Sequence, residues 1–222
     1  MNVFFTADLH FGHGPNKKGY GGIIFHTHRP FPDTDSMDNA IIAHWNSMVG
    51  HGDHVWILGD FAWRNHVQYM HRLSGKKFLV KGSHDMMNTD ALRLFAEVHA
   101  GMAQRSFDGK IFTLTHCAMR VWERSHYGSI NLYGHSHGRL TETDDRLQMD
   151  VGVDVWDYKP VPLELILMIM KTRKHSENQR TAAELEADVA ALAQRNAGYR
   201  ATLESEMCHK INSSNTTGGN AT

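Results

Sequence analysis

The chain has 222 residues, which is enough for one compact domain with an appendage and tight for two full domains. Its 23 lysines and arginines nearly balance 24 aspartates and glutamates, so the net charge gives no electrostatic reason to expect a nucleic-acid or membrane-surface partner. Two distant cysteines, Cys117 and Cys208, indicate neither a disulfide framework nor a thiolate zinc site, which favours a reducing cytoplasm.

The sequence shows no export or membrane signal. No basic and apolar segment precedes Val3, and the longest apolar run, Leu163 to Met170, is too short to cross a bilayer. We therefore expect a soluble cytoplasmic chain without a membrane partner. The unusual number is 17 histidines, because histidine is both a metal ligand and an acid/base group near neutral pH.

The first half of the chain alternates short β-rich runs with helical patterns. A strand is expected from Asn2 to Thr6, and Gly12 to Pro32, rich in Gly, Pro and His, is predicted to be an irregular loop that contacts substrate. Apolar spacing then predicts a helix over Met37 to Val49 behind a Ser36 cap. There follow a strand at Val55 to Leu58, a helix at Val67 to Leu73, a strand at Lys77 to Val80 and a helix at Ala91 to Val98.

The second half continues with strands and ends in a different composition. Strands are expected at Ile111 to Thr115 and Asn131 to Tyr133, strand-like or buried segments at Met149 to Val153 and Val161 to Leu165, and a helical turn at Leu163 to Thr172. Thr181 to Met207 shows the spacing of a long amphipathic helix, and Asn212 to Thr222 is expected to be disordered. We therefore divide the chain into a domain at 1–174, an amphipathic helix at 175–208 and a tail at 209–222.

Polar residues follow each of the five main predicted strands, as expected for a site at the carboxyl ends of strands in an α/β fold. On an extended segment, Asp8 and His10 point to the same side and can hold one ion. Asp60 adds a carboxylate that can bridge two cations. The imidazoles of His116, His135 and His137 suit borderline cations such as manganese, iron or zinc, where an all-oxygen set would favour magnesium or calcium. We expect two divalent ions, with manganese as the first choice and iron, zinc or nickel as alternatives.

The order Asp-x-His, Gly-Asp, Gly-Asn-His-Asp/Glu, His, Gly-His-x-His resembles the calcineurin-like metallophosphoesterases. The resemblance spans Asp8 to His137 and continues weakly, towards small bacterial and phage members, through Val151 to Trp156. It implies an α/β fold in which a two-sheet sandwich is flanked by helices and two metal ions lie at one edge. It also implies a hydrolase that attacks a phosphate ester with a metal-activated water.

The resemblance assigns roles by position. Asp8, His10 and His137 would bind the first metal, Asp60 would bridge, and Ser83, His116 and His135 would occupy positions around the second. His84 would protonate the leaving oxygen, oriented by Asp85 or another carboxylate. His13 would touch the substrate. Just past His116, Arg120 and His126 are candidates to hold phosphate oxygens, although a surface role explains Arg120 equally well.

Two departures from the family pattern bear on function. Ser83 replaces the asparagine whose amide oxygen would bind the second metal, which leaves open an active enzyme, a deliberately weakened variant or a member that binds without cutting. Asp60 is followed by Phe61-Ala62-Trp63-Arg64 without a further acid, which argues against a protein phosphatase and towards a small-molecule or nucleotide phosphodiesterase.

Partners are less defined. A nuclease subunit has thin support from Lys17, Lys18 and the C-terminal helix. That helix either forms a coiled-coil homodimer or packs back on its own domain.

Overall fold

The computed structural model describes residues 1–16, 19, 21–142 and 146–173, together with residues 187, 190, 191 and 194. The chain divides into two compact units, Met1–Glu177 and Asn178–Thr222. The predictions for Lys17, Lys18 and the tail, and nearly all of the predicted helix over Thr181 to Met207, lie outside the described residues. Among the described helices, none has the length and apolar character needed to span a membrane.

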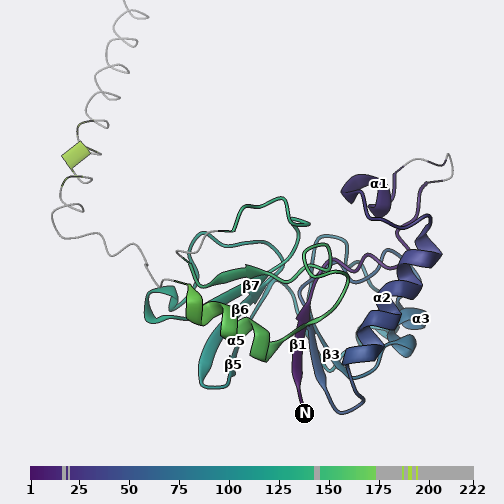
Figure 1. Cartoon of the computed structure of the whole chain (residues 1–222), viewed down its shortest axis with the longest axis horizontal. Helices are drawn as coiled ribbons and strands as arrows, with labels where there is room; N and C mark the ends of the chain where they lie inside the picture. The colour runs from purple at the N-terminus through teal and green to yellow at the C-terminus, as the bar shows by residue number, and fades with distance from the viewer. Residues whose placement is uncertain are drawn as a thin grey trace, which may run out of the picture. The chain divides into compact units, whose positions relative to one another are not determined.

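The first unit is a mixed α/β fold with two sheets (Figure 1). Its first sheet has the order β4-β3-β2-β1-β9 and is parallel except for β9. These strands are β1 (Val3–Thr6), β2 (His54–Ile57), β3 (Lys76–Val80), β4 (Glu97–His99) and β9 (Val161–Pro162). The second sheet has the order β5-β6-β7-β8, with β5 (Met102–Phe107), β6 (Lys110–Thr115), β7 (Ile130–Tyr133) and β8 (Gln148–Asp150). The predicted two-sheet sandwich flanked by helices is confirmed.

Two apolar cores hold these layers together. Along β1, Phe4 faces one core and Phe5 the other, because successive side chains of a strand point to opposite faces. The first core joins the first sheet to α2 (Thr34–Met48) and α3 (His66–Arg72), which lie together beside it in Figure 1. The second core lies between the sheets and includes Ile166 and Met170 of α5 (Leu163–Thr172).

Two helix predictions need correction. α2 begins at Thr34, and its N-cap is Asp33, whose side chain accepts a hydrogen bond of 2.7 Å from the Ser36 backbone N–H. Ser36 is therefore inside the helix. The expected helix over Ala91 to Val98 ends early, because α4 spans only Thr89–Leu92 and the chain then enters β4, whose pairing with β3 overrides the local helical spacing.

The segment from Gly12 to Pro32 is less irregular than expected. It contains the short helix α1 (Ile23–Thr27), and Ile23 at its start is buried in the first core. Another short helical element is the 3₁₀ turn η1 (Ser125–Tyr127), which precedes β7.

Candidate metal centre

The polar residues expected at the strand ends do come together at one edge. Asp8 and His10 follow β1, Asp60 follows β2, His116 follows β6, and His135 and His137 follow β7. Both sheets thus contribute, because β1 and β2 run parallel in one sheet and β6 and β7 run parallel in the other. An isolated parallel bridge between Ala7 and Gly152 joins the chain just after β1 to the segment after β8.

The six side chains form two groups of three. Asp8, His10 and His137 offer ligand atoms that all lie within 4.8 Å of one another, and so do Asp60, His116 and His135. Most of these residues are buried, while His135 is exposed. The second group is therefore open to solvent on the side of His135.

Asp60 connects the two groups. Its Oδ2 atom lies 3.5 Å from Nε2 of His10, in the first group, and 3.4 Å from Nε2 of His116, in the second. Its other oxygen, Oδ1, accepts a hydrogen bond of 2.9 Å from the His84 backbone N–H. One carboxylate oxygen therefore faces imidazole nitrogens of both groups, which is the placement that a bridging ligand needs.

The residues fit divalent cations. Asp8 Oδ1 and His10 Nε2 are buried side-chain atoms without a hydrogen-bond partner in the described part of the chain. Unpaired buried polar atoms are costly, so their presence within a group of potential ligands indicates that a cation satisfies them. The mixture of imidazole nitrogen and carboxylate oxygen suits transition metals such as manganese, iron and zinc.

The backbone around these residues adopts an uncommon conformation. Five of the six have positive φ angles: Asp8 (58°), His10 (50°), Asp60 (54°), His135 (71°) and His137 (48°). Left-handed backbone is rare for residues other than glycine, although Asp and His tolerate it better than most. Because such conformations concentrate at functional sites, this clustering supports a binding role for this edge.

Close approach of the backbone requires glycine at two neighbouring positions. A Cβ atom on Gly134 would lie 2.6 Å from Oδ2 of Asp8, and one on Gly59 would lie 2.3 Å from Nδ1 of His116. The Gly-Asp and Gly-His parts of the motifs therefore have a steric cause, since any side chain there would displace a candidate ligand.

Arg29 and Asp154, which the sequence reasoning missed, support the first group from behind. Nε and Nη2 of Arg29 each donate a hydrogen bond of 2.8 Å to Asp154, and Arg29 also donates to the backbone carbonyls of Asp8 and Leu9. Asp154 Oδ2 in turn lies 2.7 Å from Nδ1 of His137. Such a carboxylate orients a ligating imidazole and leaves its other nitrogen facing the ion.

Burial and neighbouring charges shift the pKa values in the site. Burial raises the pKa of the Asp8 carboxyl to about 7 and lowers the pKa of His10 to about 2, which keeps that imidazole neutral. Burial also lowers the pKa of His116, but its hydrogen bond and attraction to Asp60 outweigh burial and raise the pKa to about 9. Without an ion, Asp8 and His116 therefore retain protons that a cation would displace.

The loop after β3 places His84 at the rim and Asp85 inside. The His84 ring is exposed, with its centroid 5.6 Å from that of His10. The Asp85 carboxylate is buried and accepts hydrogen bonds from the backbone N–H groups of Asp60, Phe61 and Gly82. Asp85 thus fixes the backbone of two loops, and these contacts do not support its expected role of orienting the His84 ring.

Ser83 and His13 flank the centre. Ser83 is exposed. A Cβ atom added to the preceding residue, Gly82, would lie 2.4 Å from Oδ1 of Asp60. His13 Nδ1 lies 3.2 Å from His10 Nδ1, and its ring stacks on Trp63 with centroids 4.1 Å apart. His13 is therefore next to the first group, as the expected substrate contact requires.

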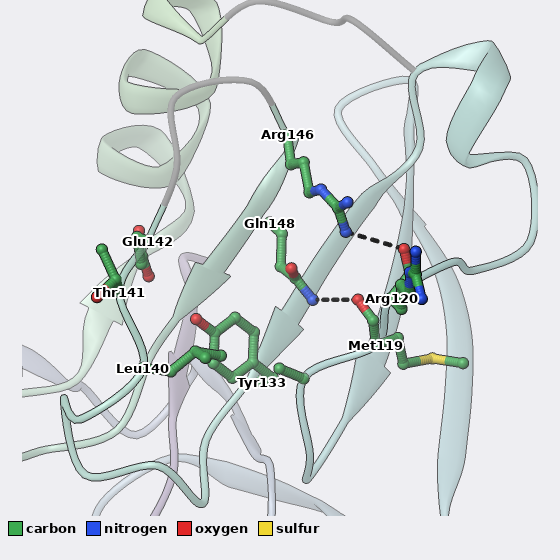
Figure 2. Close-up of a pocket in the computed structure, with 9 residues that line it drawn as sticks. Met119, Arg120, Tyr133, Leu140, Thr141, Glu142, Arg146 and Gln148 are labelled. Carbon is green, nitrogen blue, oxygen red and sulfur yellow. Dashed lines mark hydrogen bonds between the residues drawn. The ribbon is translucent and has the colours of Figure 1, made fainter. Parts of the chain in front are cut away.

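Arg120 and His126 lie elsewhere. Arg120 lines a pocket of about 330 Å³ with Arg146 and Gln148, and the residues lining this pocket include none of the six candidate ligands (Figure 2). His126 belongs to η1, just before β7 begins, whereas His135 follows the end of that strand. It thus lies towards the opposite edge of the sheet, a position that does not support contact with a phosphate at the metal groups.

The two sheets with flanking helices, and the carboxylates and imidazoles at their shared edge, give the chain the fold of the calcineurin-like metallophosphoesterases.

Comparisons with known proteins find relatives that match most of this chain. The chain is 30% identical over 198 residues to the Gene 66 protein of Mycobacterium phage D29, covering 73% of this chain and 92% of that protein. It is 25% identical over 182 residues to the uncharacterized protein MJ1445 of Methanocaldococcus jannaschii, covering 78% and 93%. A solved structure, the protein of unknown function AQ665 from Aquifex aeolicus, matches with a TM-score of 0.57 at 21% identity, covering 76% of this chain and 98% of that one. No family model matches the chain. The chain belongs to the same family as the phage Gene 66 protein.

Proposed function

We propose that the chain is a phosphoesterase that binds two divalent cations and hydrolyses a phosphate mono- or diester of a small molecule or nucleotide. The observation that carries this proposal is the position of Asp60, whose Oδ2 lies within 3.5 Å of His10 Nε2 and 3.4 Å from His116 Nε2. Asp8, His10 and His137 would hold the first ion, His116 and His135 the second, and Asp60 both.

The two groups together offer four imidazoles and two carboxylates, a mixed set that suits transition metals better than magnesium or calcium. Manganese is the metal that we propose to test first, with iron, zinc or nickel as alternatives. When bound, two such cations lower the pKa of a water and stabilise negative charge that develops on the phosphate.

The chain's own residues would then position the reaction. His84 is exposed at the rim, and its backbone N–H is fixed by Asp60 Oδ1, so its ring can deliver a proton to a departing oxygen. His13, held against His10, is placed to donate a hydrogen bond to the substrate. Asp154 keeps the His137 ring in the orientation that ligation needs.

The test is hydrolysis of bis- and mono-nitrophenyl phosphate with and without added manganese, in the unmodified protein and in a Ser83→Asn variant. We expect manganese-dependent release of nitrophenol from at least one ester. The absence of metal-dependent turnover of both esters, in both proteins, would reject the proposal.

A second candidate function is a member that binds metal or nucleotide but has lost catalysis, which Ser83 favours because its short, exposed hydroxyl replaces an amide ligand. The metal content per chain separates the two. One retained ion without turnover would support the binding member, whereas two tightly held ions with turnover would exclude it.

We also propose that residues 1–174 form the catalytic domain and that the segment from Thr181 to Met207, predicted from its sequence to be a helix, mediates dimerisation. Sedimentation of the full chain and of a chain ending at Lys174 tests this, since a dimer is expected only with the helix. Monomers in both cases would remove the dimer from the proposal.

A further inference from the structure

We propose that Trp63 is a stacking platform for a nucleobase, so that the substrate of the proposed phosphoesterase is a nucleoside phosphate ester. This inference rests on the proposed function for its catalytic step. Its binding step concerns Trp63 alone and can be measured separately.

The position of Trp63 is fixed by the backbone that also fixes the metal groups. It lies three residues after Asp60, where a parallel bridge joins Ala62 to Phe11 and the Trp63 backbone N–H donates a hydrogen bond of 2.8 Å to the Phe11 carbonyl. Phe11 in turn directly follows His10. The indole is thus attached to the two segments that carry Asp60 and His10.

One face of the indole packs against a histidine ring, and part of the residue remains exposed to solvent. The His13 ring stacks on it, with centroids 4.1 Å apart and an interplanar angle of 6°, yet the tryptophan remains 49% exposed. A large aromatic side chain that is held by a neighbour and still half exposed offers a rigid surface for a flat partner, at little further cost in conformational freedom.

A chain of rings links this surface to the candidate metal centre. The His84 centroid lies 5.1 Å from that of Trp63 and 5.6 Å from that of His10, while the His13 centroid lies 5.2 Å from that of His10. A phosphate held at the metal groups would therefore direct one of its substituents towards Trp63, beside the residue proposed to protonate the leaving oxygen.

The chemistry of the surface selects the substituent. Every nucleobase has a planar aromatic face, and stacking on an aromatic side chain tolerates any base. Alkyl and glycerol substituents have no such face. The platform therefore favours nucleoside esters by an amount that we expect to be on the order of tenfold or more in affinity.

The kinetic test compares two diesters with the same leaving group, thymidine 5′-(4-nitrophenyl) phosphate and methyl 4-nitrophenyl phosphate, in the presence of manganese. Trp63→Leu is expected to lower the ratio of kcat/KM for the thymidine ester over the methyl ester by about tenfold, mainly through KM. Trp63→Phe should retain most of the ratio. Tyr127→Leu, which removes an exposed aromatic ring from η1, is the matched control. Equal losses for both esters in Trp63→Leu would indicate a structural role and overturn the inference.

The binding test needs no turnover. Calorimetry gives the Kd of thymidine 5′-monophosphate and of glycerol phosphate, and only the first should weaken in Trp63→Leu. If the unmodified protein hydrolyses neither diester, this measurement still decides the role of Trp63, while the nitrophenyl phosphate assays decide the proposed function. Equal Kd values for the two ligands in the unmodified protein would overturn the inference.

The base can come from a free nucleotide ester or from the terminal nucleotide of single-stranded DNA. A short oligothymidylate assayed beside the thymidine ester separates these sources by the larger kcat/KM. Trp63→Leu should weaken the preferred one, and an unchanged KM for both would contradict the platform.

Discussion

Arg29 and Asp154 form a buried ion pair through two hydrogen bonds of 2.8 Å, although 125 residues separate them in the chain. The Arg29 side chain is fully buried and the Asp154 side chain is 8% exposed. The pair joins the Gly12 to Pro32 segment to the loop after β8, and it contacts the backbone of Asp8 and the ring of His137. It thus connects three separate parts of the chain behind the first candidate metal group.

Asp154→Asn should weaken both the fold and the first metal site. The substitution leaves the Arg29 guanidinium buried without a counter-charge, which costs about 3–5 kcal/mol in comparable cases. It also removes the carboxylate that orients His137, so metal affinity should fall by about 10- to 100-fold. Thermal unfolding and metal titration measure the two effects.

Asp157→Asn is the matched control, because Asp157 is an exposed acid three residues away whose carboxylate forms an ion pair with Lys159. It should change Tm and metal affinity little. If Asp154→Asn behaved like this control, the ion pair would have no supporting role.

Single substitutions should separate the two metal groups. His137→Ala removes a ligand from the first group only, and His135→Ala from the second only, so each should retain about one ion per chain. Asp60→Ala should lower occupancy at both groups, because Asp60 Oδ2 faces both. Metal analysis after gel filtration gives the stoichiometry. Two ions per chain in Asp60→Ala would contradict the bridging role.

Ser83→Asn should strengthen the second site. An asparagine supplies an amide oxygen where serine offers a shorter, neutral hydroxyl, and we expect roughly tenfold tighter binding of the second ion, equivalent to ~1.4 kcal/mol. Titration with manganese, followed by calorimetry, tests this. Ser74→Asn controls for the substitution itself, because Ser74 lies before β3 whereas Ser83 follows that strand. An unchanged or weaker second affinity would show that the loop does not bring residue 83 to the ion.

The stabilising effect of metal should grow with pH. The folded pKa values of Asp8, about 7, and His116, about 9, both exceed their usual values of 3.8 and 6.5. For groups with raised pKa values, the stabilisation is complete below the usual pKa and is lost as the pH rises through the folded one. His10, whose pKa is lowered to about 2, acts in the opposite direction only below its usual pKa of 6.5. The metal-free protein should therefore lose stability as the pH rises from about 6.5 to about 9, whereas bound ions replace the protons.

Tm measured at pH 5.5, 7 and 8.5, with EDTA and with manganese, tests this expectation. The difference between the two Tm values should widen with increasing pH. A difference that shrinks as the pH rises would contradict the expected proton displacement.

Much of the site was predictable because its parts are local. Each candidate ligand lies within a few residues after a strand whose β-rich sequence is visible, so the edge where Asp8, Asp60 and His116 meet could be predicted from the order of the strands. The Asp108-Gly109 dipeptide between β5 and β6 is a sequence signal for a hairpin turn and could have revealed β5. In the structure both residues have the positive φ angles that such dipeptides adopt in hairpins.

Other features depend on contacts that no local pattern contains. Arg29 and Asp154 are distant in the chain and resemble ordinary charged residues until the fold brings them together. The spacing of Ala91 and Phe95 is helical, and both are buried, but pairing of β4 with β3 decides the structure of the segment. The position of His126 could not be predicted, because its proximity to His116 in the sequence does not reveal near which end of β7 it lies.

The left-handed backbone at Asp8, His10, Asp60, His135 and His137 limits how this protein can be improved or can evolve. Each such residue costs the fold on the order of 1 kcal/mol, and glycine would relieve that cost. Yet glycine has no side chain with which to bind an ion. At these five positions a substitution that stabilises the fold therefore removes a candidate metal ligand. Selection for heat resistance alone would favour glycine there and abolish metal binding.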